Sequence, residues 1–371
     1  MSKRKIVMFV YGDITTDARV QRSAKALCDD FEVIVISEDF KKPLPNNSEY
    51  RNVLVGKSNG SRLNYFRCVI DAIKIIKDEK PDIVYGHDYY SAAIIRFFLP
   101  HKYCKKTVYD AHELYIPERG RTMTLRSLLF YRIEKSIVNR VDVLFCANEK
   151  RGSIMAEHYG LERVPKAIHN ISQLCLNDDD KTKDILSSLE SFWRLPGKTV
   201  VYAGAMIGSR HLDILVKAVA SLAPDYKLLM LGKGDSYDSL KELAASFSNM
   251  KSLFVGAVPY SSLGAILSRC DIGYLYYPVD TLNNIYCASN KIYEYASVCL
   301  PILANQNPTI LEIIEEGGIG IATDDLQMGL FNISKSLELF KKNCELFNRR
   351  NPWAKDEELL RNTIKAISYE S

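Results

Sequence analysis

The sequence lacks the short motifs that mark several common classes of protein. None of its nine cysteines belongs to a C-x-x-C pair, and no His/Cys cluster has the spacing of a zinc site. Neither half contains a G-x-G-x-x-G fingerprint or a Walker loop, and the turn Gly232-Lys233-Gly234 is only a weak substitute. These absences argue against disulfide-rich, zinc-binding, NAD-dependent and ATP-dependent proteins, and the scattered cysteines predict free thiols in a reducing cytosol.

Long apolar runs are also missing. The basic start is followed by the five apolar residues Ile6–Val10, whereas a signal peptide carries an apolar region of roughly 7–15 residues. No stretch approaches the ~18 apolar residues of a membrane-spanning helix. We therefore expect a cytoplasmic protein whose membrane contact is limited to the inner surface of the membrane.

Charge is unevenly divided along the chain. Residues 1–170 contain 29 Lys and Arg against 21 Asp and Glu, a net charge of +8, and the remainder contains 20 against 24, a net charge of −4. An anionic partner of the first half, such as a membrane surface or a lipid phosphate, accounts for this difference. An accidental difference between two soluble domains accounts for it equally well, and nothing in the pattern indicates nucleic acid.

Apolar periodicity predicts strands that alternate with helices in both halves. At 371 residues the chain also exceeds the ~250–300 at which a single core stops growing. The predicted strands are 5–10, 31–37, 81–85, 106–110, 141–147, 167–169, 199–203, 227–231, 253–255, 272–276 and 301–304, with helices at 17–28, 61–80, 91–99, 125–139, 148–159, 211–221, 236–246, 261–268, 291–297, 309–315 and 353–371.

This alternation predicts two Rossmann-like α/β domains in series, each a doubly wound parallel sheet. The polar stretch 171–198 reads as the linker, and its run Asp178-Asp179-Asp180 as solvated linker rather than a metal motif. Ligands bind such sheets beyond the carboxyl ends of the strands, so we expect them in a cleft that both domains face.

The segment from Ala288 to Ala296 places a small polar turn before a helix that carries one cation and one carboxylate. Helix N-terminal N–H groups attract phosphate oxygens, and Lys291 adds a positive charge there. Glu294, one turn later, is able to accept hydrogen bonds from ribose hydroxyls. In isolation, an ordinary helix with Ser289 as its cap and with Lys291 and Glu294 facing solvent is the favoured interpretation of this segment.

An ordered set of motifs carries a family resemblance. The stretch SNKIYEYASVCLPILA, followed by Glu316-Gly317-Gly318-Ile319-Gly320, resembles the donor-site region of the family-four glycosyltransferases of the GT-B fold. The motifs Val10–Asp13, Asp17–Val20, Gly86–Asp88, Tyr109–Leu114, Ile168–Asn170 and Tyr202–Gly204 resemble other motifs of the same proteins, so that nearly the whole chain is covered in order.

The resemblance implies domains 1–172, for the acceptor, and 173–352, for the nucleotide-sugar donor, with the helix 353–371 crossing back onto the first. It implies His112 beside the transferred sugar, with Glu113, Asp88 and His87 as neighbours, and Arg19 orienting the acceptor or a phosphate. The implied donor-binding residues are Gly12, Asp13, Arg210, Ser289, Asn290, Lys291 and Glu294. No metal and no cofactor beyond the donor substrate is expected.

Two positions depart from the family pattern. The first carboxylate of its E-x7-E pair is replaced by Tyr286, and an arginine that often follows the first glycine of the second domain is replaced by Ala205. The resemblance implies a retaining transfer from a UDP- or GDP-sugar to a hydroxyl of a glycan or lipid-linked acceptor, in cell-surface polysaccharide or glycolipid synthesis. A non-catalytic glycosyltransferase-like subunit and, less favoured, a sugar-nucleotide epimerase remain alternatives.

The basic segment Arg119–Arg140 contains leucines and isoleucines at helical spacing. Core packing explains the apolar stripe most simply. A peripheral membrane contact is the second interpretation, because Arg119, Arg121 and Arg126 lie beside Met123 and Leu125.

Overall fold

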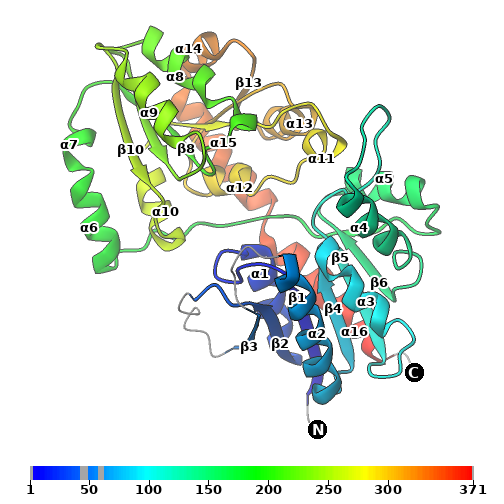
Figure 1. Cartoon of the computed structure of the whole chain (residues 1–371). Coiled ribbons are helices and arrows are strands. Elements are labelled where there is room, and N and C mark those ends of the chain that lie inside the picture. Colours follow the sequence, from blue (N-terminus) through cyan, green and yellow to red (C-terminus); the bar gives the residue numbers. More distant parts are fainter. Residues whose placement is uncertain (1–2, 42–48, 57–61, 370–371) are drawn as a thin grey trace. The chain divides into compact units, whose positions relative to one another are not determined.

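The structure is a computed structural model of the chain, and it describes residues 3–41, 49–56 and 62–369. The chain forms two compact units, one of Met1–Asn170 with Trp353–Ser371 and the other of Ile171–Pro352 (Figure 1). Ser61, the predicted first residue of one helix, and the predicted last two residues of the terminal helix lie outside the described residues.

The first unit is built on a parallel sheet of seven strands in the order β3-β2-β1-β4-β5-β6-β7. The strands are β1 (Arg4–Val10), β2 (Phe31–Glu38), β3 (Arg51–Val55), β4 (Ile83–His87), β5 (Lys106–Ala111), β6 (Val143–Cys146) and β7 (Lys166–Ala167). Its helices are α1 (Ala18–Cys28), α2 (Arg62–Glu79), α3 (Ala92–Phe98), α4 (Leu125–Lys135), α5 (Glu149–Tyr159) and α16 (Trp353–Tyr369), with the 3-10 turn η1 (Tyr89–Ser91).

The second unit contains a parallel sheet of six strands in the order β10-β9-β8-β11-β12-β13. The strands are β8 (Lys198–Ala203), β9 (Tyr226–Leu231), β10 (Lys251–Gly256), β11 (Ile272–Leu275), β12 (Ile302–Ala304) and β13 (Gly320–Ala322). Its helices are α6 (Asp180–Ser188), α7 (Glu190–Trp193), α8 (Leu212–Ser221), α9 (Tyr237–Ala245), α10 (Tyr260–Leu267), α11 (Leu282–Ile285), α12 (Asn290–Ser297), α13 (Pro308–Gly317), α14 (Leu326–Lys335) and α15 (Leu337–Arg350), with the turn η2 (Gly208–Arg210).

The prediction of two parallel-sheet α/β domains is confirmed, but several elements were missed. The stretch 171–198 was wrongly read as linker, because it contains α6 and α7. The side chain of Asp179, predicted to be solvated linker, caps α6 by accepting a hydrogen bond from Thr182 N. The strands β3 and β13 and the helices α11, α14 and α15 were not predicted. The missed strands are short and only partly buried, so they lack a strong apolar pattern.

The terminal helix α16 belongs to the first unit. Its residues Leu360 and Ile364 are fully buried in the same core as Ile6 and Met8 of β1. Asp30, just after α1, pairs with both Arg361 and Lys365 of α16. An apolar face and ion pairs on the neighbouring turn thus hold this helix against α1 and the sheet.

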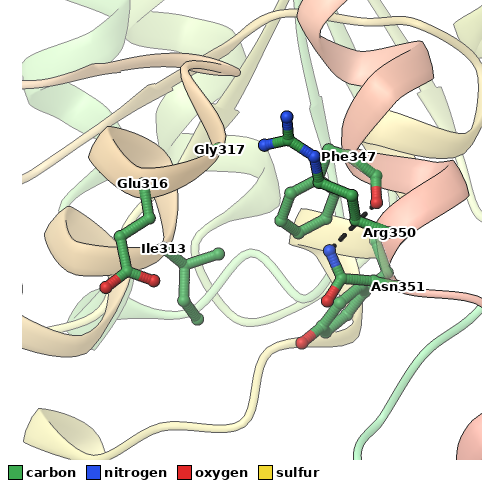
Figure 2. Close-up of a pocket in the computed structure, with 7 residues that line it drawn as sticks. Ile313, Glu316, Gly317, Phe347, Arg350 and Asn351 are labelled. Carbon is green, nitrogen blue, oxygen red and sulfur yellow. Dashed lines mark hydrogen bonds between the residues drawn. The ribbon is translucent and has the colours of Figure 1, made fainter.

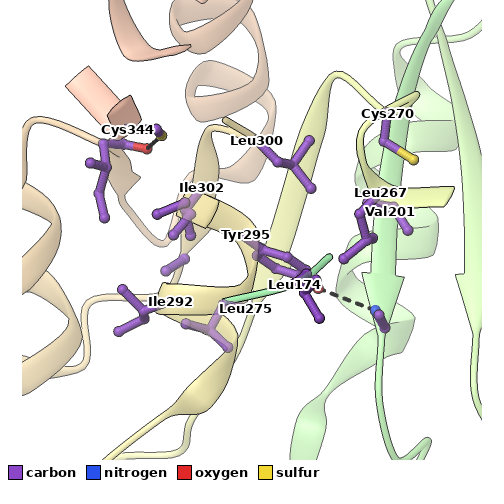
Figure 3. Packing of buried hydrophobic residues seen from close by; sticks show 14 of the residues in the cluster. Leu174, Val201, Leu267, Cys270, Leu275, Ile292, Tyr295, Leu300, Ile302 and Cys344 are labelled. Carbon is purple, nitrogen blue, oxygen red and sulfur yellow. Dashed lines mark hydrogen bonds between the residues drawn. The ribbon is translucent and has the colours of Figure 1, made fainter. Parts of the chain in front are cut away.

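The core of the second unit positions the start of α12. Tyr295 is fully buried, and its hydroxyl accepts a hydrogen bond from Ala203 N at 3.2 Å (Figure 3). The same hydroxyl donates a hydrogen bond to Tyr274 O at 3.2 Å. Leu300 and Ile302 pack in the same cluster. Because Ala203 ends β8, this one side chain ties α12 to the carboxyl end of the central strand.

The sequence predicts no membrane-spanning helix and free thiols. Among the described residues, no helix combines the length and the apolar character needed to cross a bilayer. All nine cysteines are free thiols, and six of them are buried.

Candidate active site

The predicted site of the first unit lies at the carboxyl edge of three adjacent strands. β4 pairs with β1 on one side and with β5 on the other, in a register that places His87 beside both Val10 and Asp110. The residues that follow these strand ends are therefore close in space, as the parallel sheet requires.

A buried ion pair forms the floor of this edge. Arg19 of α1 donates to both oxygens of Asp110, at 2.6 Å and 3.1 Å, and both side chains are at least 96% buried. Arg19 also donates to Ile168 O and Asn170 Oδ1. The expectation that Arg19 orients a substrate is therefore wrong, because its guanidinium is enclosed and fully committed within the protein.

His87 and His112 meet above Asp110. The Nδ1 atom of His87 lies 3.2 Å from Nε2 of His112, and each of these atoms lies 3.6 Å from Asp110 Oδ2. His87 is fully buried, whereas 16% of the His112 side chain is exposed. Burial raises the pKa of Asp110, but Arg19 and the histidines outweigh it, and the pKa lies well below its ordinary value.

Asp88 combines backbone strain with one carboxylate oxygen that has no partner among the described residues. Its φ is +60°, a left-handed value that is uncommon for residues other than glycine. Its Oδ1 is buried and has no hydrogen-bond partner among the described residues. Burial, with a further contribution from Glu113, raises the pKa of Asp88 to about 7. Strain and an orphaned carboxylate at a strand end are typical of a binding or catalytic position.

The remaining predicted residues of this unit occupy the same edge. Glu113 follows His112 and is exposed. Gly12 follows β1, and open space lies where a side chain would begin. The Asp13 carboxylate accepts hydrogen bonds from the backbone N–H and the hydroxyl of Thr15, so the Asp13 side chain shapes its own turn. The Gly12 carbonyl accepts a hydrogen bond from Glu38 N, so the space open to a ligand lies beside the Gly12 Cα.

In the second unit, Lys291 is folded over Gly204 at the end of β8. A Cβ atom added to Gly204 would lie 2.7 Å from Lys291 Cε and 3.2 Å from Nζ, and the φ of Gly204 is +157°. A side chain at this position would strain the backbone and would displace the end of the Lys291 side chain. Among the described residues, no carboxylate forms an ion pair with Lys291.

The N-terminus of α12 lacks the cap that its sequence predicts. Ser289 stands at the N-cap position, but its hydroxyl makes no capping hydrogen bond. Its Oγ is buried and has no hydrogen-bond partner among the described residues. The residue as a whole is only 3% exposed. A buried hydroxyl and free N–H groups at Asn290 and Lys291 together form a site that attracts an anion.

Glu294 lies one helical turn after this site. It is 5% exposed, and its Oε1 accepts a hydrogen bond from the hydroxyl of Tyr260 at 3.2 Å. No described residue donates to Oε2. The carboxylate thus keeps one oxygen for a hydroxyl of a ligand.

Arg210 reaches the end of β11 from the turn η2. Its Nη1 donates to Tyr276 O at 2.8 Å, and its guanidinium lies 4.0 Å from the centre of the Tyr277 ring. Asn305, which follows β12, fixes the backbone of Tyr277 through hydrogen bonds to both its N–H and its carbonyl. Arg210 is therefore held in place, and one of its N–H donors is already bonded to the backbone of Tyr276.

The two departures from the family pattern lie beside these residues. Ala205 follows Gly204 directly, and its carbonyl accepts a hydrogen bond from Tyr202. Tyr286 follows α11, a short helix that Asn307 holds through its hydrogen bond to Asn284 O. Neither position supplies the charge that the family pattern places there.

The second unit also contains a pocket of about 290 Å³, which is distinct from the strand-end site. Figure 2 shows its lining, in which Glu316 of α13 and Arg350 of α15 flank Phe347. None of the predicted donor-binding residues lines this pocket. It is therefore not the predicted nucleotide site.

Three side chains of the first unit are close enough to share a metal ion. The ligand atoms of His87, Asp110 and His112 lie within 4.8 Å of one another. However, Arg19 occupies both oxygens of Asp110, and His87 Nε2 has no acceptor among the described residues. Because a metal-bound imidazole normally donates its other N–H, this cluster is better suited to hydrogen bonding. The expectation of a metal-independent site stays a prediction.

Sequence reasoning missed several residues that shape both edges. For Asp110 a signal existed, since residues two apart on a strand share a face and Asp110 therefore lies on the His112 side. Gly204 was noted as part of a motif, but its contact with Lys291, 87 residues later, was not predicted. For Tyr260 and Asn305 no local signal existed, because their partners are 34 and 28 residues away.

Family models match most of the chain. The model for Glycosyltransferase Family 4 matches residues 18–171, and the model for Glycosyl transferases group 1 matches residues 197–336. Among curated proteins, no sequence match to the chain was found.

Solved structures match nearly the whole chain at low sequence identity. The chain is similar to sucrose-phosphate synthase from Thermosynechococcus elongatus, with 14% identity, coverage of 98% and 99% of the two chains and a TM-score of 0.74. It is similar to the Anabaena protein HepE, with 15% identity, coverage of 98% and 100% and a TM-score of 0.71. It is also similar to WaaG, a glycosyltransferase involved in lipopolysaccharide biosynthesis, with 14% identity, coverage of 98% of both chains and a TM-score of 0.63.

These structural similarities establish the fold, and the two family models establish the activity class. The matched segments fall in separate units, one on each parallel sheet. The chain is therefore a glycosyltransferase of the GT-B fold, resembling family four.

Proposed function

We propose that this glycosyltransferase moves a sugar from a nucleoside diphosphate sugar to a hydroxyl group, with the diphosphate held at the start of α12. The observation that carries this proposal is the anion site formed by the uncapped helix start, the unpartnered Ser289 hydroxyl and Lys291. In this site the diphosphate oxygens would accept the hydrogen bonds that Ser289 and the N–H groups do not make within the protein.

The chemistry follows from the charges at this edge. As the bond to the sugar breaks, negative charge grows on the diphosphate leaving group. Lys291, Arg210 and the α12 N–H groups would stabilise that charge without reorganising. Glu294 would hold the ribose through its free oxygen, and His112, with Asp88 and Glu113 beside it, would contact the transferred sugar.

UDP is the first nucleotide to test. The Anabaena protein HepE was solved with UDP and glucose and also with UDP-glucose. That precedent supports a UDP-sugar for this chain, with a GDP-sugar as the alternative. A retaining outcome is also proposed, and the anomeric configuration of the product, read by NMR, tests it directly.

A donor panel tests the proposal. Hydrolysis of UDP- and GDP-sugars is measured for the wild type, Lys291→Ala and Glu294→Ala, with Lys217→Ala as the control for loss of a lysine. Lys217 is an exposed residue of α8 that pairs with Asp213. We expect one class of donor to be hydrolysed and both site variants to lose that activity.

Other outcomes would support the alternatives. Binding of nucleotide without turnover on any donor and acceptor would indicate a non-catalytic subunit. This alternative is considered because Tyr286 and Ala205 lack the charges that the family pattern places at their positions. Isomerisation of the donor without an acceptor would indicate an epimerase.

We also propose that the first unit docks on an anionic membrane surface that carries a lipid-linked acceptor. Three apolar residues of α2 at helical spacing (Leu63, Phe66 and Ile70) are 65%, 57% and 53% exposed. On α4, Leu125 is 89% and Leu129 52% exposed. The rings of Tyr65 on α2 and Phe130 on α4 are 5.4 Å apart, so the two helices are neighbours.

Charge favours a bilayer as the occupant of this surface. Arg67 of α2 and Arg126 and Arg132 of α4 are exposed among these apolar residues. Apolar side chains interleaved with arginines match the boundary between anionic headgroups and acyl chains. The location on the inner face of the membrane remains a prediction that this docking would explain.

Vesicle flotation tests the docking. We expect the full chain to bind vesicles containing phosphatidylglycerol, and Leu125→Ser with Leu129→Ser to reduce the bound fraction severalfold. Leu339→Ser on α15, an exposed leucine of the second unit, is the matched control. Equal binding of the double variant, or capture by a protein instead of vesicles, would refute the proposal.

A further inference from the structure

His87 is a buried histidine at the end of β4 that no substrate is able to reach. Its ring is stacked on Tyr85, with centroids 4.5 Å apart, and it has no exposed surface. Its Nδ1 faces Nε2 of His112 at 3.2 Å. Its Nε2 is buried and has no hydrogen-bond partner among the described residues.

Only one of the two ring nitrogens of His87 is a favourable position for its proton. Burial lowers the pKa of His87, so the ring is neutral and carries a single proton. A proton on Nε2 would bury an N–H without an acceptor, which is rarer and more costly than a buried lone pair. The proton therefore lies on Nδ1, which points at Nε2 of His112.

This arrangement decides the state of His112. A neutral His112 that accepts the His87 hydrogen bond at Nε2 must carry its own proton on Nδ1, because the hydrogen bond of one ring nitrogen determines the tautomer. Although burial lowers the pKa of His112, the Asp110 carboxylate raises it overall. A doubly protonated His112 would direct its own Nε2–H at the Nδ1–H of His87, so the hydrogen bond from His87 favours the neutral ring of His112 with its proton on Nδ1.

Most of the charged and titratable groups that face His112 are acidic, and acidic neighbours favour a proton on its ring. Asp17, Asp88 and Asp110 are acidic, while Arg19 neutralises Asp110. No described residue forms a hydrogen bond with His112 Nδ1. This nitrogen is therefore not committed within the protein.

We propose that His87 is a positioning residue that keeps a proton on Nδ1 of His112, so that His112 presents an N–H donor to a sugar hydroxyl and does not act as a general base. The part of this inference that concerns the sugar depends on the proposed function. The part that concerns the tautomer depends only on the geometry of His87, His112 and Asp110.

Nitrogen NMR of the full chain labelled with ¹⁵N-histidine tests the tautomer without any substrate. His112→Gln identifies the His112 signals. We expect a protonated Nδ1 in the wild type at pH 8. In His87→Phe the proton should move to Nε2, where Asp110 accepts it, and His87→Asn should restore the Nδ1 proton because its amide supplies a donor at the same place.

Turnover is measured on the same variants. His87→Phe should lower kcat roughly twofold to tenfold, the effect of one lost neutral hydrogen bond, while His87→Asn should stay near the wild type. Thermal unfolding shows which variants are folded. If His87→Phe fails to fold, the wild-type spectrum still decides the question.

Three results would count against the inference. A wild-type His112 with its proton on Nε2 would overturn it. Equimolar Zn²⁺ that binds at His87 Nδ1 and His112 Nε2, and so shifts the His87 proton to Nε2, would replace it with a metal site. A tautomer that moves without any change in kcat would uphold the positioning role and refute instead the contact of His112 with the sugar.

Discussion

Gly204→Ala tests whether the close approach of Lys291 to the end of β8 serves donor binding. The added Cβ would lie 2.7 Å from Lys291 Cε, well inside contact distance, and the φ of +157° suits only glycine. Because the obstructing atom belongs to a flexible side chain, Lys291 is displaced rather than the fold lost. The backbone strain should lower the free energy of unfolding by roughly 1–3 kcal/mol.

Displacing Lys291 removes one charged hydrogen bond to the diphosphate. Such a bond contributes about 1.5–3 kcal/mol, so the Kd for the nucleoside diphosphate should rise roughly tenfold to 150-fold. Calorimetric titration of Gly204→Ala, Lys291→Ala and the double variant measures this. If the glycine acts through Lys291, the double variant should bind no worse than Lys291→Ala alone. Additive losses would refute the reasoning.

Three other substitutions test ionisable side chains of the first unit by urea unfolding at several pH values. Burial raises the pKa of Asp88 from 3.8 to about 7, so wild-type stability should fall as the pH rises through this window, by up to about 4 kcal/mol. Asp88→Asn should remove this fall and be the more stable protein at pH 8; an unchanged pH profile would contradict the unpaired carboxylate. Although burial lowers the pKa of His169, hydrogen bonds to Asp356 and Glu149 raise it to about 9. The stabilisation is complete below pH 6.5 and is lost as the pH rises through 9, so His169→Asn should be destabilising at pH 6 by up to about 3 kcal/mol and nearly neutral at pH 10. Arg19→Met leaves Asp110 buried and unpaired and should cost about 3–5 kcal/mol; adding Asp110→Asn should recover part of that loss, and a mild effect of the single change would mean that water reaches the pair.

The regular elements near the centre of each sheet were predictable from local patterns. Strands such as β1 and β9 are almost continuously apolar and buried, and they alternate with amphipathic helices. The failures were elements with weak patterns. β3 has only one fully buried residue, and α6 is a polar helix that begins at the capping residue Asp179.

The composition of the candidate site was predictable in part. Placing His112 and Asp88 together needed only the rule that parallel strands end at one edge of the sheet. The prediction for Arg19 failed because its sequence neighbours do not reveal that Asp110, 91 residues later, encloses it in an ion pair. Burial, which is a property of the packed chain, turned a candidate ligand-binding residue into a structural one.

The sequence by itself determined the alternation of strands and helices, the two parallel sheets and the motifs at their strand ends, because these depend on local apolar periodicity and turn residues. Only the tertiary structure decided how those motifs work. It left the Ser289 hydroxyl without a partner in the part of the chain that the structure describes, folded Lys291 over Gly204 and turned Nδ1 of His87 toward His112. Hydrogen bonding and desolvation between residues far apart in the chain set those states, and no local pattern encodes them.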